Sequence, residues 1–340
     1  MRNLNGLRSR KVLDFICILL SLHFAIAYLT LTHPMVAFGP YKDINHLRGP
    51  FAFRMLPAMV WKFVAYVAAR LHRGLPRLHL PQLNPPFDSY DNWFLVFLTF
   101  GAMLGTLSVA RRLVRDIGGR GGAEWLALGM AYAAYFDTIL VLNRNLFYPY
   151  DVTAMFFFTA LSYLAYRGRP LSFALLLVPA MLNKETAAMA IFLYFGFHVN
   201  RRNLHKVIGL CTAFGLETIA IRFGQSCYLN ARCAGCAGPP EHHLGMNLRQ
   251  MANPLFWAAF PAVYGFAWVA ALIFWRFVPV RTRRTVGGLF AAWFLVMVVT
   301  GVIREIRIFS ELSAPLLIVI AEGVSAWRTE KNAEKSLMAA

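Results

Sequence analysis

The sequence predicts an all-α polytopic membrane protein, and three observations support this fold class. Of the 340 residues, 58% are hydrophobic and only 15% are charged, whereas soluble domains are typically about 25% charged. The mean hydropathy is +0.51. Apolar runs long enough to cross a bilayer recur along the whole chain. This composition excludes a soluble enzyme, a disordered chain and a secreted mini-protein.

The strongly basic balance has a simple explanation in such a protein. The net charge of +18 comes from 34 Lys and Arg against 16 Asp and Glu. In a soluble protein this excess would indicate nucleic-acid binding, but the cytoplasmic loops of membrane proteins also collect Lys and Arg. We therefore expect membrane lipids as partners and no nucleic acid.

The spans follow from the length of the apolar runs, because a helix needs about 20 apolar residues to cross the bilayer. The first predicted span, at 12–31, follows four basic residues, and no small-residue cleavage site comes after it. It is therefore expected to be an uncleaved anchor with its N-terminus in the cytoplasm. Further predicted spans lie at 92–110, 123–142, 150–166, 205–223, 256–275, 286–303 and 309–326.

The apolar stretch at 171–199 is interrupted by four polar residues at 183–186. One long helix there would place Lys184 and Glu185 near the middle of the membrane, at a cost of several kcal/mol. Two short helices meeting at the polar residues avoid this cost. The split gives about ten crossings, puts both termini in the cytoplasm and places 20 of the 34 basic residues on six short cytoplasmic pieces.

The segment 51–69 is apolar, but it contains Arg54, Lys62 and Pro57. As a crossing it would move the arginines that follow the next span to the outer side. We therefore predict an amphipathic helix on the outer membrane surface, within a long extracytoplasmic loop at 32–91.

The domain organisation is correspondingly simple. Residues 1–326 are expected to form one transmembrane domain, and 327–340 a cytoplasmic tail. A second extracytoplasmic loop, at 224–255, contains cysteines.

This topology brings polar side chains from four separate segments to the outer face. They are Asp43, Arg48 and Arg54; Asn143, Arg144, Tyr148, Tyr150 and Asp151; Asn183, Lys184 and Glu185; and Arg304, Glu305, Arg307 and Glu311. Charged groups at span ends are costly in lipid unless they pair or face water, so a shared polar cavity is expected. Interfacial anchoring and local ion pairing, for example between Arg307 and Glu311 one turn later, remain the alternative.

The charges of this cavity suggest its ligand. The cations in these segments outnumber the carboxylates, and arginine binds phosphate through two parallel hydrogen bonds. An anionic lipid headgroup or lipid phosphate is therefore the expected ligand. Asp43, in a loop beside Lys42, is the best candidate for a general base, and a turn-forming aspartate is the alternative.

Several short motifs resemble the GT-C superfamily of integral-membrane glycosyltransferases. They are the acidic residue in the first outer loop followed by Phe-Ala-Phe-Arg-Met-Leu-Pro at 51–57, Tyr-Pro-Tyr-Asp at 148–151, Asn-Lys-Glu-Thr at 183–186, and Glu-Ile-Arg-Ile-Phe at 305–309. Together they cover most of the chain.

The resemblance implies a GT-C-like fold and transfer of a sugar from a polyprenyl-phosphate donor to a glycan, lipid or protein acceptor. The reaction would occur on the outer face of a bacterial inner membrane. Asp43 would deprotonate the acceptor hydroxyl, and the basic residues would stabilise the departing lipid phosphate. Tyr148 and Tyr150 would stack on the sugar or anchor the interface. No metal ligands are identified, and the need for a divalent cation stays open.

Three cysteines, Cys227, Cys233 and Cys236, precede His242 and His243. The loop is outside in this topology, so a disulfide from Cys227 to Cys233 or Cys236 is the leading expectation. A metal site and free thiols remain open.

Two other function classes remain open at this stage. The first is a non-catalytic protein that binds a lipid carrier or assists polysaccharide assembly, which the single carboxylate in the first loop favours. The second is a transporter or flippase. Transport would require polar residues through the membrane depth, for which Asp14, His23, Asp137 and Glu217 are the candidates.

Overall fold

The computed structural model describes residues 2–34, 53–70, 90–119, 123–140, 146–232, 242–303 and 305–338. The described residues form helices joined by short turns, with two short strands, β1 (His33–Pro34) and β2 (Leu146–Phe147), which pair in parallel. The predicted all-α fold class is therefore confirmed.

Six helical stretches in the described residues are long and apolar enough to cross a membrane. They are Lys11–Leu31, Asp91–Gly118, Leu204–Arg232, Pro254–Phe277, Val280–Thr300 and Arg307–Met338. The length and composition of these helices therefore indicate a multi-pass membrane protein.

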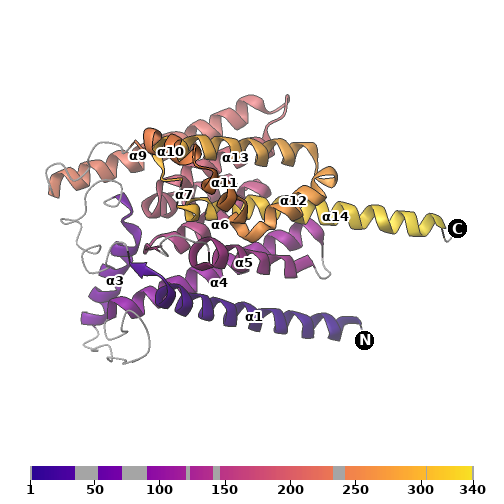
Figure 1. The fold of residues 1–340 in the computed structure, drawn as a ribbon, viewed down its shortest axis with the longest axis horizontal. Helices are drawn as coiled ribbons and strands as arrows, with labels where there is room; N and C mark the ends of the chain where they lie inside the picture. The colour runs from indigo at the N-terminus through magenta and orange to yellow at the C-terminus, as the bar shows by residue number, and fades with distance from the viewer. Residues whose placement is uncertain are drawn as a thin grey trace.

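The first half of the bundle is built on α1 (Arg2–Leu31) and α4 (Tyr90–Gly118), with α3 (Leu56–Arg70) between them in the chain. Figure 1 shows α1 along one edge, with α3 at the end of the molecule opposite both termini. Within the predicted amphipathic segment at 51–69, the structure describes a helix that begins at Leu56, and its placement on the outer membrane surface stays a prediction.

The predicted span at 123–142 is not one regular helix. It consists of the 3₁₀ segment η3 (Ala123–Ala127), the helix α5 (Leu128–Tyr135) and the π-helical turn η4 (Phe136–Leu140). In η4 the carboxylate of Asp137 accepts a hydrogen bond from the backbone N–H of Tyr264, at 2.7 Å. A long-range polar contact therefore accompanies the change of helix type.

The predicted break at 183–186 is confirmed. Helix α6 (Asp151–Arg167) leads into α7 (Pro170–Asn183), which ends where Lys184 adopts an extended conformation with φ −161° and ψ 134°. A 3₁₀ turn, η5 (Glu185–Met189), and α8 (Ala190–His198) follow. The polar residues therefore lie at a helix break.

The second half of the chain is less regular than predicted. Helix α9 (Leu204–Arg232) extends nine residues past the expected end at 223, and α10 (Leu244–Met251) lies inside the predicted loop. Next come α11 (Pro254–Ala259), η6 (Phe260–Phe266), α12 (Ala267–Phe274) and η7 (Trp275–Phe277). The predicted span at 256–275 is therefore interrupted, because Tyr264, Gly265 and Phe266 have left-handed backbone conformations.

The chain ends with α13 (Val280–Thr300), η8 (Ile306–Leu312) and α14 (Ser313–Met338). Residues 327–338 of the expected tail continue α14 as helix. Figure 1 shows the C-terminal end of α14 projecting from the same side of the molecule as the N-terminus.

Helix α6 lies at the centre of the packing. It contacts α4, α7, α8, α14 and η8. Its Phe158 is fully buried and meets the buried Trp293 of α13 edge to face, with the ring centroids 5.3 Å apart. On its other side, a Cβ added at Gly105 of α4 would lie 2.7 Å from the Phe156 ring, so a glycine is needed for this close approach. Helix α6 is therefore packed closely against both α4 and α13.

Candidate functional site

Four segments that are distant in the sequence meet in one cluster of charged side chains, which we call the ionic cluster. Its members are Arg54 from the chain before α3, Asp151 from the start of α6, Lys184 and Glu185 from the α7–η5 break, and Glu305, Arg307 and Glu311 from the η8 region. All seven are among the polar residues predicted from the sequence to lie on one face.

The ionic cluster is connected by a series of ion pairs. A nitrogen of Lys184 lies 2.6 Å from a carboxylate oxygen of Glu311 and 3.9 Å from one of Asp151. Asp151 also accepts a hydrogen bond from Arg307, at 2.9 Å, and Arg307 contacts Glu305 as well. The same side chains therefore link η8 to the start of α6 and to the helix break.

A second branch connects the chain before α3 to the helix break. Arg54 donates to Glu185 at 2.9 Å and also donates to the hydroxyl of Tyr150. The guanidinium of Arg54 lies 4.4 Å from the centre of the Tyr150 ring, and that of Arg307 lies 3.7 Å from the centre of the Tyr148 ring. Cation–π contacts therefore orient both guanidinium groups.

Burial divides the ionic cluster into a centre and a rim. The side chains of Lys184 and Asp151 are each 7% exposed, and that of Glu311 is 1% exposed. Glu185 and Glu305 are 35% and 27% exposed. Buried charges are tolerated only with close partners, so the central residues depend on one another.

Neutral side chains complete the centre. Thr186 donates to Glu311 at 2.6 Å. Asn183, which is fully buried, accepts from Thr153 at 2.6 Å and donates to the backbone carbonyl of Tyr150 at 3.1 Å. Asn183 thus joins the end of α7 to the start of α6.

One carboxylate at the rim of the ionic cluster, that of Glu185, has a shifted pKa. Burial by itself would raise the pKa of Glu185, but the charge and the hydrogen bond of Arg54 outweigh it and lower the pKa to about 2. Glu185 is therefore ionised at neutral pH.

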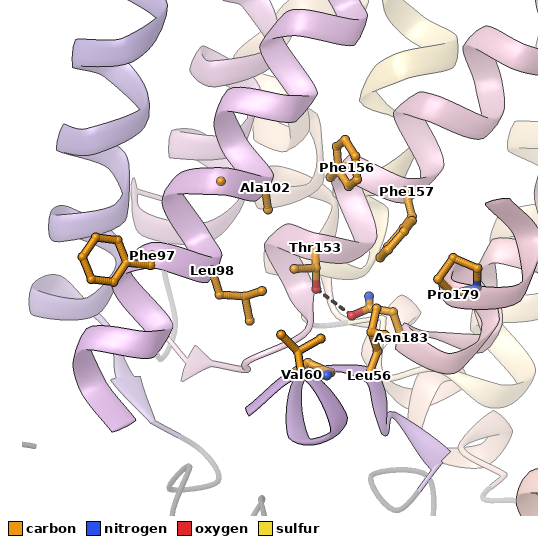
Figure 2. A pocket seen from close by; sticks show the side chains of 12 residues that line it. Leu56, Val60, Phe97, Leu98, Ala102, Thr153, Phe156, Phe157, Pro179 and Asn183 are labelled. Carbon is orange, nitrogen blue, oxygen red and sulfur yellow. Dashed lines mark hydrogen bonds between the residues drawn. The ribbon is translucent and has the colours of Figure 1, made fainter. Parts of the chain in front are cut away.

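An apolar cavity of about 370 Å³ lies beside the ionic cluster, between α3, α4, α6 and α7. Figure 2 shows Leu56 and Val60 of α3 beneath it and Phe156 and Phe157 of α6 above it. Its polar lining residues are Thr153 and Asn183, joined by the hydrogen bond drawn in Figure 2. Leu56, Thr153 and Asn183 each lie within two residues of a cluster member in the sequence, so the cavity and the ionic cluster adjoin.

The expected excess of cations is not present among the described members of the ionic cluster. Three cations, Arg54, Lys184 and Arg307, face four carboxylates. The other predicted residues, Asp43, Arg48, Asn143, Arg144 and Arg304, lie outside the described residues.

Sequence reasoning missed Arg222 of α9, which stacks on the Phe53 ring with 3.5 Å between the guanidinium carbon and the ring centre. Its charge also contributes to lowering the pKa of Glu185. The available signal was an arginine inside a predicted span, because such a residue needs a partner or a function.

The cysteine prediction stays a prediction, because it falls partly outside the described residues. Among the described residues, Cys227 is a free, exposed thiol on α9. The continuation of α9 as helix to Arg232 fixes Cys227 on a helical surface. Cys233 and Cys236 lie outside the described residues. Within the part of the chain that the structure describes, no group of three or more His, Cys, Asp or Glu side chains is placed to hold a metal ion.

Comparison with known proteins adds no relative: no protein-family model, curated protein or solved structure matches the chain.

Proposed function

We propose that the protein is an integral-membrane glycosyltransferase that moves a sugar from a polyprenyl-phosphate donor to an envelope glycan, lipid or protein acceptor. The observation that carries the proposal is the ionic cluster of four converging segments beside an apolar cavity. A lipid-linked sugar combines these same two features, because it joins a polar, anionic head to a long hydrocarbon chain.

The proposal includes a GT-C-like arrangement with ten crossings and both termini in the cytoplasm of a bacterium. The break at Lys184 supports it, since two short helices can enter and leave the membrane from the same side. The two termini also project from the same side of the molecule (Figure 1). In this topology the ionic cluster faces the outside.

The proposed chemistry is direct displacement at the anomeric carbon. Asp43 takes the proton of the acceptor hydroxyl while the acceptor oxygen bonds to the anomeric carbon. The bond from that carbon to the phosphate oxygen breaks, and the polyprenyl phosphate leaves with the bonding electrons. Nearby guanidinium groups stabilise the charge on the departing phosphate.

A non-catalytic lipid-carrier-binding protein is the second candidate, and one observation favours it. Each of the three described cations in the ionic cluster already contacts a carboxylate. A cluster that neutralises its own charges can hold the helices in place for binding without taking part in a reaction.

A transporter is less well supported. Three of the four candidate in-membrane polar residues have separate local partners: Asp14 pairs with Arg111, His23 contacts the Tyr135 hydroxyl at 2.5 Å, and Asp137 accepts from the Tyr264 backbone. The fourth candidate is Glu217 of α9. No hydrogen bond among the described residues links one of these groups to another, as a relay would require.

The test is sugar release from a labelled donor. Membranes containing the wild-type protein are incubated with a panel of undecaprenyl-phosphate-linked radiolabelled hexoses and pentoses, together with envelope extract as acceptor. We expect the wild type to transfer label from the undecaprenyl-phosphate donor to another molecule of the extract, and a loss of at least a hundredfold, on the order of general-base effects, in Asp43→Asn.

Asp88→Asn, in the same predicted loop, is the matched control and should retain transfer. Full transfer by Asp43→Asn would remove that residue from the mechanism. Donor binding without transfer by the wild type would favour the non-catalytic candidate.

A further inference from the structure

Helix α9 carries a charged residue in an unusual setting. Only 11% of the apolar part of α9 is buried inside the protein, yet Arg222 lies within its candidate span. The guanidinium of Arg222 stacks on Phe53, at 3.5 Å from the ring centre. Phe53 directly precedes Arg54 of the ionic cluster, so Arg222 lies at the edge of that cluster.

Gln225, less than one turn further along α9, contacts the same residue. Its amide nitrogen donates to the backbone carbonyl of Phe53 at 2.7 Å, and the Gln225 side chain is buried, with 4% of the residue exposed. Arg222 and Gln225 thus hold the ring and the backbone of Phe53 from the same face of α9, and both side chains have fixed positions.

Both side chains have an enclosed polar atom without a hydrogen-bond partner in the described part of the protein. These atoms are Nη1 of Arg222, which is a donor, and Oε1 of Gln225, which is an acceptor. Enclosed polar groups are nearly always hydrogen-bonded in folded proteins, so each atom leaves a hydrogen-bonding capacity that a ligand atom can fill.

Arg222 also differs from the cations of the ionic cluster. Arg54, Lys184 and Arg307 each have a carboxylate oxygen within 4.0 Å, whereas no described carboxylate lies that close to Arg222. A phosphate at Lys184 or Arg307 would have to displace the buried carboxylates of Glu311 or Asp151. A phosphate at Arg222 displaces no carboxylate, and the side chain is partly exposed.

We infer that Arg222 and Gln225, held by Phe53, form the subsite for a lipid phosphate that carries a neighbouring hydroxyl group. A phosphate oxygen accepts from the Arg222 guanidinium, and the hydroxyl donates to Oε1 of Gln225. This inference rests on the proposed function for its ligand, a polyprenyl-phosphate-linked sugar. Phosphatidylglycerol offers the same two groups, so the experiment must distinguish the two sources.

The experiment measures binding to the full-length protein in phosphatidylcholine nanodiscs by native mass spectrometry. The probes are undecaprenyl phosphate, undecaprenyl phosphate linked to a hexose, and phosphatidylglycerol. The variants are Arg222→Gln, Arg222→Lys and Gln225→Leu. Arg232→Gln, on the same helix at an exposed position over the Tyr228 ring, is the matched control.

Arg222→Gln should weaken binding of both polyprenyl probes about tenfold to a hundredfold, as expected for a charge-assisted hydrogen bond. Arg222→Lys keeps the charge but loses the planar fork of the guanidinium. Its affinity for the polyprenyl probes should therefore lie between that of the wild type and that of Arg222→Gln. Gln225→Leu should weaken binding of the sugar-bearing probe about fivefold and leave binding of undecaprenyl phosphate unchanged. Arg232→Gln should match the wild type.

The arms separate the two hypotheses. If the wild type binds the polyprenyl probes and Arg222→Gln and Arg222→Lys bind them equally well, the subsite is wrong while the proposed function stands. If only phosphatidylglycerol binds, and its binding depends on Arg222, the subsite is supported and the proposed function fails. Absence of Arg222-dependent binding for all three probes overturns the subsite.

Discussion

The two ends of the helical bundle handle their charges in different ways. At the end with the ionic cluster, Lys184, Asp151 and Glu311 are almost fully buried and share partners from three segments. At the other end, Arg167 pairs with Asp116 at 3.4 Å, and these side chains are 44% and 21% exposed. Desolvation makes the first set interdependent, whereas water screens the second.

This contrast separates an exposed ion pair with a local effect from buried charges that hold several segments together. Arg167 lies at the end of α6 and Asp116 near the end of α4, and this exposed pair is local in its effect. The buried charges connect α6, α7 and η8 and are suited to hold the ionic cluster in place. Mutations at the two ends should therefore differ strongly in their effect on stability.

The largest effect is expected at the buried centre. Glu311→Gln leaves Lys184 with Asp151 alone, at 3.9 Å, and removes the carboxylate that accepts from Lys184 and Thr186. Loss of one partner of a buried pair typically costs about 3–5 kcal/mol, and we expect that reduction in the free energy of unfolding. Denaturant unfolding in detergent micelles measures it.

Asp116→Asn is the control at the exposed end. The comparison fails if this substitution destabilises the protein as much as Glu311→Gln. A double substitution, Lys184→Met with Glu311→Leu, should recover part of the lost stability, because it leaves neither charge uncompensated.

A change in pH is expected to have an intermediate effect on stability, through Glu185 at the rim of the ionic cluster. Because the pKa of Glu185 is about 2 in the folded protein and about 4.3 in an unfolded chain, its stabilising contribution is present above about pH 4.3. It is lost as the pH falls towards 2. Glu185 is about one third exposed, so the change is moderated by solvent.

The difference in melting temperature between the wild type and Glu185→Gln, recorded from pH 6 to pH 3, measures this contribution. The difference should be largest at pH 6 and shrink as the pH falls. A difference that is constant over this range would show that the charge of Glu185 contributes nothing.

The smallest effect is expected at the exposed end. Arg167→Gln removes the pair with Asp116, and exposed pairs contribute about 0–1 kcal/mol. We expect a change in unfolding free energy below about 1 kcal/mol, reduced further by added salt. A salt-independent loss as large as that of Glu311→Gln would abolish the distinction between the two ends.

The helix break at Lys184 was predictable because it follows from local energetics. Two adjacent charges in the middle of a long apolar stretch cannot remain in lipid at low cost, whatever the rest of the chain does. The irregular course of 123–140 was not predictable in this way. The π turn at Phe136–Leu140 is accompanied by a contact between Asp137 and Tyr264, which lie 127 residues apart.

Arg222 was likewise not predictable from local sequence as part of the candidate site. Sequence reasoning placed it inside an ordinary span, because the spacing of apolar residues on a helix does not reveal which neighbour packs against each face. Its role depends on Phe53, which lies far earlier in the chain and reaches α9 only in the folded protein.

The sequence by itself determined that this is a multi-pass helical membrane protein with a break at the Asn183–Thr186 polar residues, since hydrophobic length and the cost of charge in lipid are local properties. Only the tertiary structure decided the partners of each charge, the excess of carboxylates in the described ionic cluster and the free thiol of Cys227. The physical reason is that ion pairs, hydrogen bonds and cavities join residues that are distant in the chain, and their positions depend on how all the helices pack.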